Sequence, residues 1–130
     1  MVESIRSEEA PIPVGPYSQA VRACAGDVLF SAGQIAIDPS TGEMCPGGVA
    51  EQTRRVMENL KAVLEAGGFG FADVVKTTVY MSDMGDFITM NKVYKEYFSE
   101  PYPARSCFGV TALPKGALVE IDLVAVREAG

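Results

Sequence analysis

The chain has 130 residues and a mass of 13.8 kDa, which predicts a single domain spanning residues 1–130. Hydrophobic residues make up 48% of the sequence and charged residues 22%, a composition typical of a globular protein. Seventeen acidic residues against eleven basic ones give a net charge of −6. This charge argues against nucleic acids and anionic membranes as partners, because both need a basic surface.

The sequence contains no histidine, which excludes Ser-His-Asp and Cys-His nucleophile pairs and zinc sites with histidine ligands. Any chemistry must therefore use Asp, Glu, Arg, Lys, Tyr, Cys, Ser or backbone groups. Because Asp, Glu and Cys residues also form no clustered set, we expect no metal site.

The three cysteines, Cys24, Cys45 and Cys107, are too few and too scattered for a disulfide framework. The first residues lack the apolar segment of a signal peptide, and no apolar run approaches the ~20 residues that span a bilayer. We therefore expect a cytoplasmic protein without a membrane partner.

Hydrophobic periodicity and turn residues divide the chain into eight elements, the first of them a short polar strand. The predicted elements are strands at 2–6, 19–24 and 28–37, a helix at 49–66, a strand at 73–81, a helix at 86–98, and strands at 104–112 and 118–127. The proline-rich segment 10–17 is predicted to be a loop. The order β-β-β-α-β-α-β-β indicates an α/β (α+β) domain, a mixed sheet with two helices on one face.

Residues alternate along the last predicted strand. Those expected to face the helices are Val119, Ile121, Leu123 and Ala125, whereas the other face carries Leu118, Glu120, Asp122, Val124 and Val126. If that face is exposed, its two carboxylates are simply solvated. If another subunit covers it, the pKa of at least one carboxyl rises toward a value suited to proton transfer.

The preceding strand places Arg105 and Cys107 on one face. An arginine held after the rigid segment 102–104 can bind a small carboxylate with two parallel hydrogen bonds, or it can be an ordinary surface or ion-pair arginine. Cys107 is either a packed thiol or a reactive one, and Tyr17 is either a core or interface aromatic or a ligand contact. These alternatives remain open on pattern alone.

Several motifs, in order and with the expected spacing from about residue 3 to residue 127, resemble the RidA family. They are Gly15-Pro16-Tyr17-Ser18-Gln19-Ala20, Ala32-Gly33-Gln34-Ile35, Val75-Lys76-Thr77-Thr78-Val79, Asn91, Pro103-Ala104-Arg105-Ser106, Leu113-Pro114-Lys115 and Val119-Glu120-Ile121. The family is also called the L-PSP or translation-inhibitor family.

The resemblance implies a chorismate-mutase-like fold, a homotrimer, and ligand clefts between neighbouring subunits. It also implies hydrolysis of reactive 2-imino acids, such as 2-iminobutyrate and 2-iminopropanoate, to 2-oxo acids and ammonia. This reaction requires no metal and no cofactor. A trimer would cover the sheet face that the two helices leave open.

By position, the resemblance implies that the catalytic residues are Arg105, Glu120 and Tyr17. Arg105 is expected to bind the substrate carboxylate, Glu120 to position or activate the attacking water, and Tyr17 to line the cleft. The remaining expected substrate contacts are the Cys107 backbone, Asn91, the Gly33 backbone and Phe87.

One position departs from the family pattern. The family often has serine directly before the Gly-Gln of this motif, whereas this chain has Ala32 there and Ser31 one residue earlier. A one-residue offset in a strand points a side chain to the opposite face, so we expect no hydroxyl contact to substrate from this position.

Three other functions are compatible with parts of this pattern. A trimer could capture a small carboxylate metabolite without turnover and so regulate a partner. The RNA cleavage associated with the family fits poorly with a charge of −6, since phosphate contacts dominate RNA affinity. A chorismate mutase would be suggested by fold alone.

Overall fold

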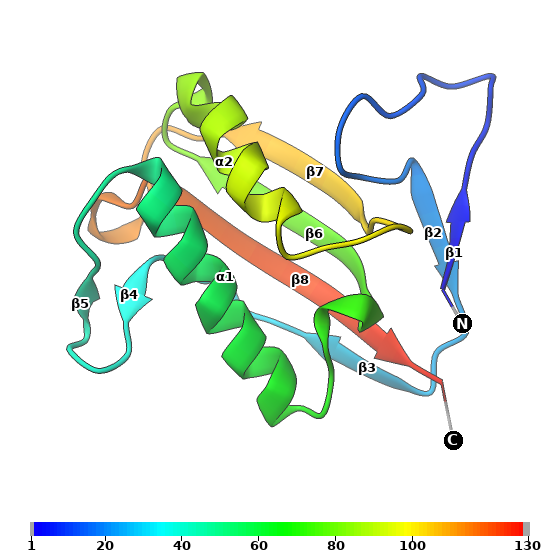
Figure 1. The fold of residues 1–130 in the computed structure, drawn as a ribbon, viewed down its shortest axis with the longest axis horizontal. Helices are drawn as coiled ribbons and strands as arrows, with labels where there is room; N and C mark the ends of the chain where they lie inside the picture. Colours follow the sequence, from blue (N-terminus) through cyan, green and yellow to red (C-terminus); the bar gives the residue numbers. More distant parts are fainter. Residues whose placement is uncertain (1, 129–130) are drawn as a thin grey trace.

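Four strands form the central sheet of the computed structural model, which describes residues 2–128 (Figure 1). In order across the sheet they are β3 (Asp27–Phe30), β8 (Val119–Arg127), β6 (Val74–Met81) and β7 (Ala104–Gly109). β8 is antiparallel to both of its neighbours, and β6 and β7 are parallel. The helix α2 (Phe87–Lys95) joins the two parallel strands, which need such a crossover. The sheet is mixed, as predicted.

Two short antiparallel pairs flank this sheet. β1 (Val2–Ile5) pairs with β2 (Ala20–Ala23), and a bridge between Ser18 and Ala104 places this ribbon next to the start of β7. The second pair is β4 (Ile37–Asp38) with β5 (Glu43–Met44). Single 3₁₀ turns lie at Phe71–Asp73, Met84–Asp86 and Pro114–Gly116.

The predicted strand 28–37 is wrong in its extent, because the chain bulges after Phe30. Ser31 lies opposite Leu123 and donates its N–H to the Leu123 carbonyl, and Gln34 exchanges backbone hydrogen bonds with Ile121. The chain advances three residues from Ser31 to Gln34 while β8 advances only two, so the segment contains one extra residue and forms a β-bulge. The Ser31 hydroxyl accepts the Leu123 N–H at 2.9 Å and so replaces a backbone carbonyl in the ladder.

Helix α1 (Val49–Ala66) lies across the sheet and buries one stripe of side chains. Its start is capped by the Glu51 carboxylate, which accepts the Gly48 N–H at 2.8 Å. Its end is closed by Gly68 at φ +81°, a conformation that glycine adopts without strain. The predicted helix bounds 49–66 are confirmed.

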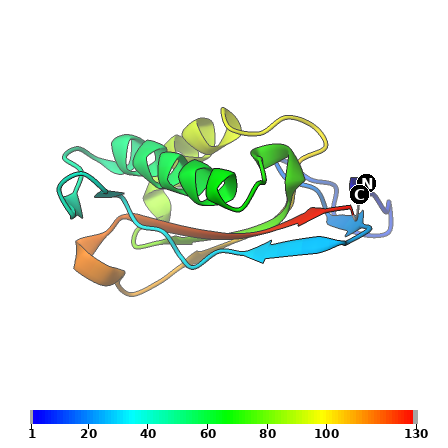
Figure 2. The same ribbon diagram turned by 90° about the horizontal axis from the view of Figure 1, so that it is seen from below.

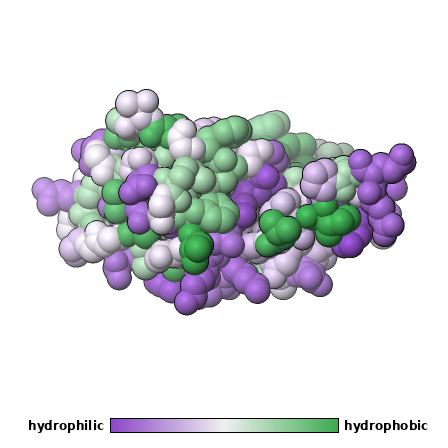
Figure 3. Space-filling view, turned by 90° about the horizontal axis from the view of Figure 1, so that it is seen from above, coloured by the Kyte–Doolittle hydropathy of each residue, from purple (hydrophilic) through white to green (hydrophobic). Residues whose placement is uncertain are grey.

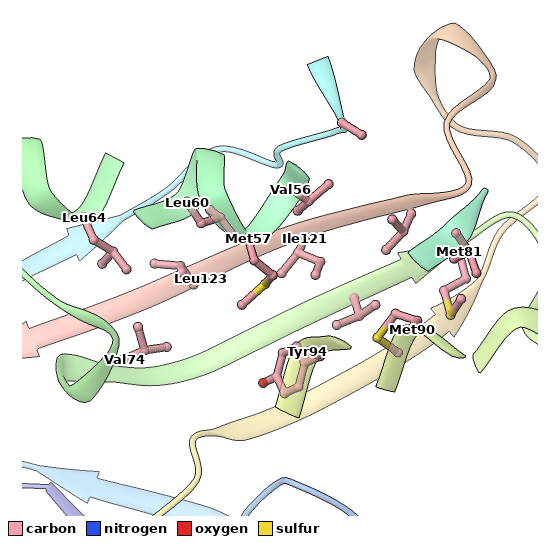
Figure 4. Packing of buried hydrophobic residues seen from close by; sticks show 14 of the residues in the cluster. Val56, Met57, Leu60, Leu64, Val74, Met81, Met90, Tyr94, Ile121 and Leu123 are labelled. Carbon is pink, nitrogen blue, oxygen red and sulfur yellow. The ribbon is translucent and has the colours of Figure 1, made fainter. Parts of the chain in front are cut away.

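The core fills the space between the two helices and the sheet (Figure 4). Figure 2 shows both helices above the same face of the sheet. The largest side chains buried there are Tyr94, Met57, Leu60, Leu64, Met81, Met90, Ile121 and Leu123. All four residues of β8 predicted to face the helices are buried, which confirms the alternation.

Helix α2 is shorter than the predicted 86–98. It ends at Lys95, and Tyr97 and Phe98 follow it in a turn, where both rings pack on Phe71 at 5.6 and 5.2 Å between centroids. The predicted strand 104–112 likewise ends at Gly109, so Thr111 lies outside it. In both segments the spacing of apolar side chains that predicts the element continues past the last residue with helical or strand hydrogen bonding.

The sheet face away from the helices, here called the open face, is covered by no element of residues 2–128 (Figure 2). Phe30 is 77% exposed, Phe108 52% and Val28 42%. Seen from the side on which β7 forms the sheet edge, apolar patches lie at the surface between polar residues (Figure 3). Exposed apolar surface of this kind is typical of an interaction site.

Replacing Ser31 with alanine removes the acceptor of the buried Leu123 N–H. We expect the Ser31→Ala variant to lose about 1–2 kcal/mol of unfolding free energy, the cost of a buried donor left without a partner. Urea denaturation measures this, with Ser99→Ala as an exposed control. A loss no greater than that of the control would contradict the structural role of this hydroxyl.

Candidate functional site

Arg105 lies on β7 opposite Thr77 of β6, and its side chain extends toward the helix side of the sheet. Three aromatic rings surround its guanidinium. The distances from its central carbon to the ring centroids are 4.9 Å for Tyr94, 5.5 Å for Tyr17 and 5.6 Å for Phe87. Arginine over aromatic faces at these distances is stabilised by cation–π attraction.

One hydrogen bond fixes the direction of the guanidinium. Its Nη1 donates to the Asn91 side-chain oxygen at 2.6 Å. Within residues 2–128, no carboxylate lies within ion-pair distance of Arg105, whereas Arg22 and Arg54 pair with Glu3 and Glu96. Among residues 2–128, Arg105 is therefore oriented by neutral groups only, and its charge is available for an anionic ligand.

The ring of Tyr94 packs beneath the Arg105 guanidinium, a contact that the sequence analysis did not predict. Its hydroxyl shares a 2.8 Å hydrogen bond with Thr77, and both residues are buried. Burial raises the pKa of Tyr94 to about 12, against the opposing effects of Thr77 and Arg105. The signal for it was present, since positions 87, 91 and 94 are spaced four and three apart and share one face of α2.

Cys107 lies two residues after Arg105 on the same side of β7, half-buried against the core. Burial raises the pKa of its thiol, and the nearby Arg105 opposes that rise. The thiol is therefore protonated at neutral pH, which disfavours a nucleophilic role.

Glu120 and Gly33 lie together on the open face. A Cβ added to Gly33 would stand 2.0 Å from Oε2 of Glu120, so the carboxylate rests against the bare backbone of the bulge. Beside them, the Tyr80 hydroxyl donates to Asp122 at 3.3 Å, and burial is the largest cause that raises the pKa of Tyr80. Only glycine at position 33 allows this approach.

The expected site residues thus form two groups. Tyr17, Phe87, Asn91, Arg105 and Cys107 gather on the helix side of β7, whereas Gly33 and Glu120 lie on the open face of β8. Thr77, opposite Arg105, is buried under the helices, and Tyr80, opposite Glu120, is not. One chain therefore does not bring Arg105 and Glu120 together.

The position that departs from the family pattern is exposed. Ala32 lies at the bulge, and the hydroxyl of the preceding Ser31 is engaged by the Leu123 N–H. Ser31 therefore does not replace the missing serine side chain at position 32.

A hollow of about 500 Å³ opens on the outer side of the Arg105 group. Gly15, Asn91, Lys92 and Lys95 are among its lining residues, and a Cβ on Gly15 would stand 3.8 Å from Nη2 of Arg105. Glu100 also lines the hollow, so its two lysines and one glutamate leave a net positive charge near the arginine, which favours the approach of anions.

Other features of residues 2–128 bear on the kinds of site this chain can hold. In that part of the chain, no group of three or more Cys, Asp or Glu side chains is arranged to hold a metal ion. Neither of its helices is long and apolar enough to cross a membrane.

Comparison with known proteins gives consistent matches over nearly the whole chain. The family model described as Endoribonuclease L-PSP matches residues 7–127. A RutC family protein of Pyrococcus horikoshii is 55% identical over 98% of this chain and 100% of its own length. The 2-iminobutanoate/2-iminopropanoate deaminase of Mus musculus is 46% identical over 95% of this chain and 90% of its own length. The crystal structure of RidA from the Antarctic bacterium Psychrobacter sp. is similar with a TM-score of 0.75 at 42% identity, covering 96% of this chain and 99% of the other.

The raised pKa of Tyr94 predicts a loss of stability in alkali. The folded state keeps the Tyr94 proton up to about pH 12, whereas the unfolded chain releases it near pH 10. Tyr94 therefore contributes about 2–3 kcal/mol to the free energy of unfolding below pH 10. This contribution is lost as the pH rises from 10 to 12. Unfolding free energies measured across this range, with Tyr94→Phe as comparison, test it; an equally steep decline in the variant would contradict the assignment.

Proposed function

Because the chain belongs to the RidA (L-PSP) family, we propose that it hydrolyses reactive 2-imino acids, such as 2-iminobutanoate and 2-iminopropanoate, to 2-oxo acids and ammonia. The chorismate-mutase-like fold expected of this family is the fold of this chain. The observation that carries the proposal is the state of Arg105, an arginine oriented by three rings and an amide and paired with no carboxylate of residues 2–128.

Arg105 would bind the carboxylate that every 2-imino acid carries. A guanidinium offers two parallel N–H donors to one carboxylate, and Asn91 already occupies Nη1 with one hydrogen bond. Binding the acid group fixes the neighbouring C=N carbon at a constant distance from Arg105. Orientation of this kind lowers the entropic part of the barrier to water addition.

Glu120 would act as the general base and general acid that transfers protons during hydrolysis. As water adds to the C=N carbon, one of its protons passes to the carboxylate and then to the nitrogen, which gives a neutral carbinolamine. The carboxylate then moves the proton of the new hydroxyl group to the same nitrogen, so that the C–N bond breaks, ammonia leaves and the C=O bond forms. One carboxylate can accept the first proton and return it to nitrogen. The Cys107 backbone and Tyr17 would line the space around the imine.

We propose further that the active unit is a homotrimer whose sites lie between subunits. Arg105 and Glu120 lie on opposite faces of the sheet in one chain, and the open face exposes Phe30, Phe108 and Val28. Packing the open face of one subunit against the β7 edge of the next would cover this apolar surface. The same contact would bring Glu120 and Gly33 of one copy to Arg105 of another.

The first test uses a coupled assay in which threonine dehydratase generates 2-iminobutanoate from threonine and semicarbazide traps free imine. We expect catalytic amounts of the protein to increase 2-oxobutanoate over semicarbazone. Arg105→Ala should lower this activity by on the order of a hundredfold or more, because the charge pair with the substrate carboxylate is lost.

Arg22→Ala is the matched control, since Arg22 is an exposed arginine paired with Glu3, and it should keep full activity. Equal activity of Arg105→Ala and wild type would overturn the site. An inactive wild type that still binds carboxylates would favour the alternative of a metabolite-binding module.

The second test addresses Glu120 and the shared site together. Glu120→Gln should bind carboxylates but lose imine hydrolysis, because the amide cannot carry the proton. When Glu120→Gln and Arg105→Ala chains are unfolded and refolded together at equal amounts, about a quarter of the sites would combine an intact Arg105 with an intact Glu120.

We therefore expect recovery of about a quarter of wild-type activity from two inactive variants. Each variant refolded alone is the control and should stay inactive. Mixed oligomers without recovered activity would contradict a site shared between subunits. The roles of Arg105 and Glu120 would still be decided by the activities of the two single variants.

A further inference from the structure

Asn91 contacts Arg105 in a way that differs from a substrate contact. Its side-chain oxygen accepts the 2.6 Å hydrogen bond from Nη1, and its side-chain nitrogen lies on the side of Gly15. The residue is half-buried on α2, between Phe87 and Tyr94 on the face that surrounds the guanidinium. The bond that the amide makes in this structure is therefore one that orients the arginine.

The chemistry of this partner is informative because two other arginines of the chain have carboxylate partners, whereas Arg55, like Arg105, donates to an asparagine oxygen, that of Asn59 at 3.1 Å. Arg22 and Arg54 are oriented by the carboxylates of Glu3 and Glu96. A carboxylate at position 91 would have the same size and reach as the amide and would form the stronger hydrogen bond. It would also neutralise the guanidinium, and a neutralised guanidinium attracts a second carboxylate weakly.

We propose that Asn91 is a positioning residue that aims Arg105 at the substrate carboxylate without compensating its charge. The amide determines where the guanidinium points, and the rings of Tyr17, Phe87 and Tyr94 support it without adding a negative charge. This inference rests on the proposed function only through the role of Arg105 in binding a carboxylate. It replaces the substrate contact that the family resemblance assigns to Asn91.

The test replaces the amide by a carboxylate of equal shape. Binding of 2-oxobutanoate, the expected product, is measured by calorimetry on the wild type and on Asn91→Asp, together with the melting temperature. We expect the dissociation constant to rise on the order of tenfold or more, because the new carboxylate competes with the ligand for the guanidinium. The melting temperature should stay equal or rise, because the Arg105 hydrogen bond becomes charge-assisted.

Thr89→Asp is the matched control, because Thr89 is exposed on the same helix and the substitution adds the same charge away from Arg105. It should leave the dissociation constant within about twofold, since exposed charges at a distance are screened by salt. Equal weakening by Asn91→Asp and Thr89→Asp would overturn the proposal, as would unchanged binding in Asn91→Asp.

Asn91→Ala provides a second measurement if the aspartate variant does not fold. It removes the acceptor and leaves the charge of Arg105, so the dissociation constant should rise by a few-fold, with the same increase in KM and little change in kcat. Wild-type affinity in this variant would overturn the proposal. Failure of the wild type to bind any carboxylate would overturn it together with the role of Arg105, whereas binding without imine hydrolysis would overturn the deaminase alone.

Discussion

The two faces of β8 are the constraint on which the rest of the molecule depends. This strand lies inside the sheet, paired with β3 on one side and β6 on the other, so its register fixes both neighbours. Its residues 119, 121, 123 and 125 hold the core beneath the helices, and the residues between them face away from it. One nine-residue segment therefore sets the packing of the domain and the position of Glu120 at the same time.

Much of this arrangement follows from local pattern. The apolar stripe of α1, the glycines that end it and the alternation of β8 are determined by residues close together in the sequence, and the predicted bounds agree with the structure there. The segment after Phe30 was predicted wrongly because its β-branched and apolar residues satisfy a strand pattern. The bulge that interrupts it depends on a hydrogen bond between Ser31 and Leu123, which are 92 residues apart.

The candidate site was predictable to a different extent. The family resemblance identified Arg105, Tyr17, Phe87 and Asn91, and the structure gathers these four in contact. It could not reveal that the amide of Asn91 serves the arginine, because a residue's partner depends on side-chain directions in the folded chain. The contact of Tyr94 with the guanidinium was missed for the same reason, because helical spacing places a tyrosine on the buried side of α2 without showing which side chain it contacts.

Gly33 limits how this chain can change during evolution. The space where its side chain would lie is filled by the Glu120 carboxylate, so even a single methyl group would displace the acid. The next residue back, Ala32, already carries a side chain and is exposed in the single chain. Sequence drift in this segment is therefore expected to be uneven, because position 32 accepts a side chain and position 33 does not, and the boundary between them is set by one carboxylate from a strand far along the chain.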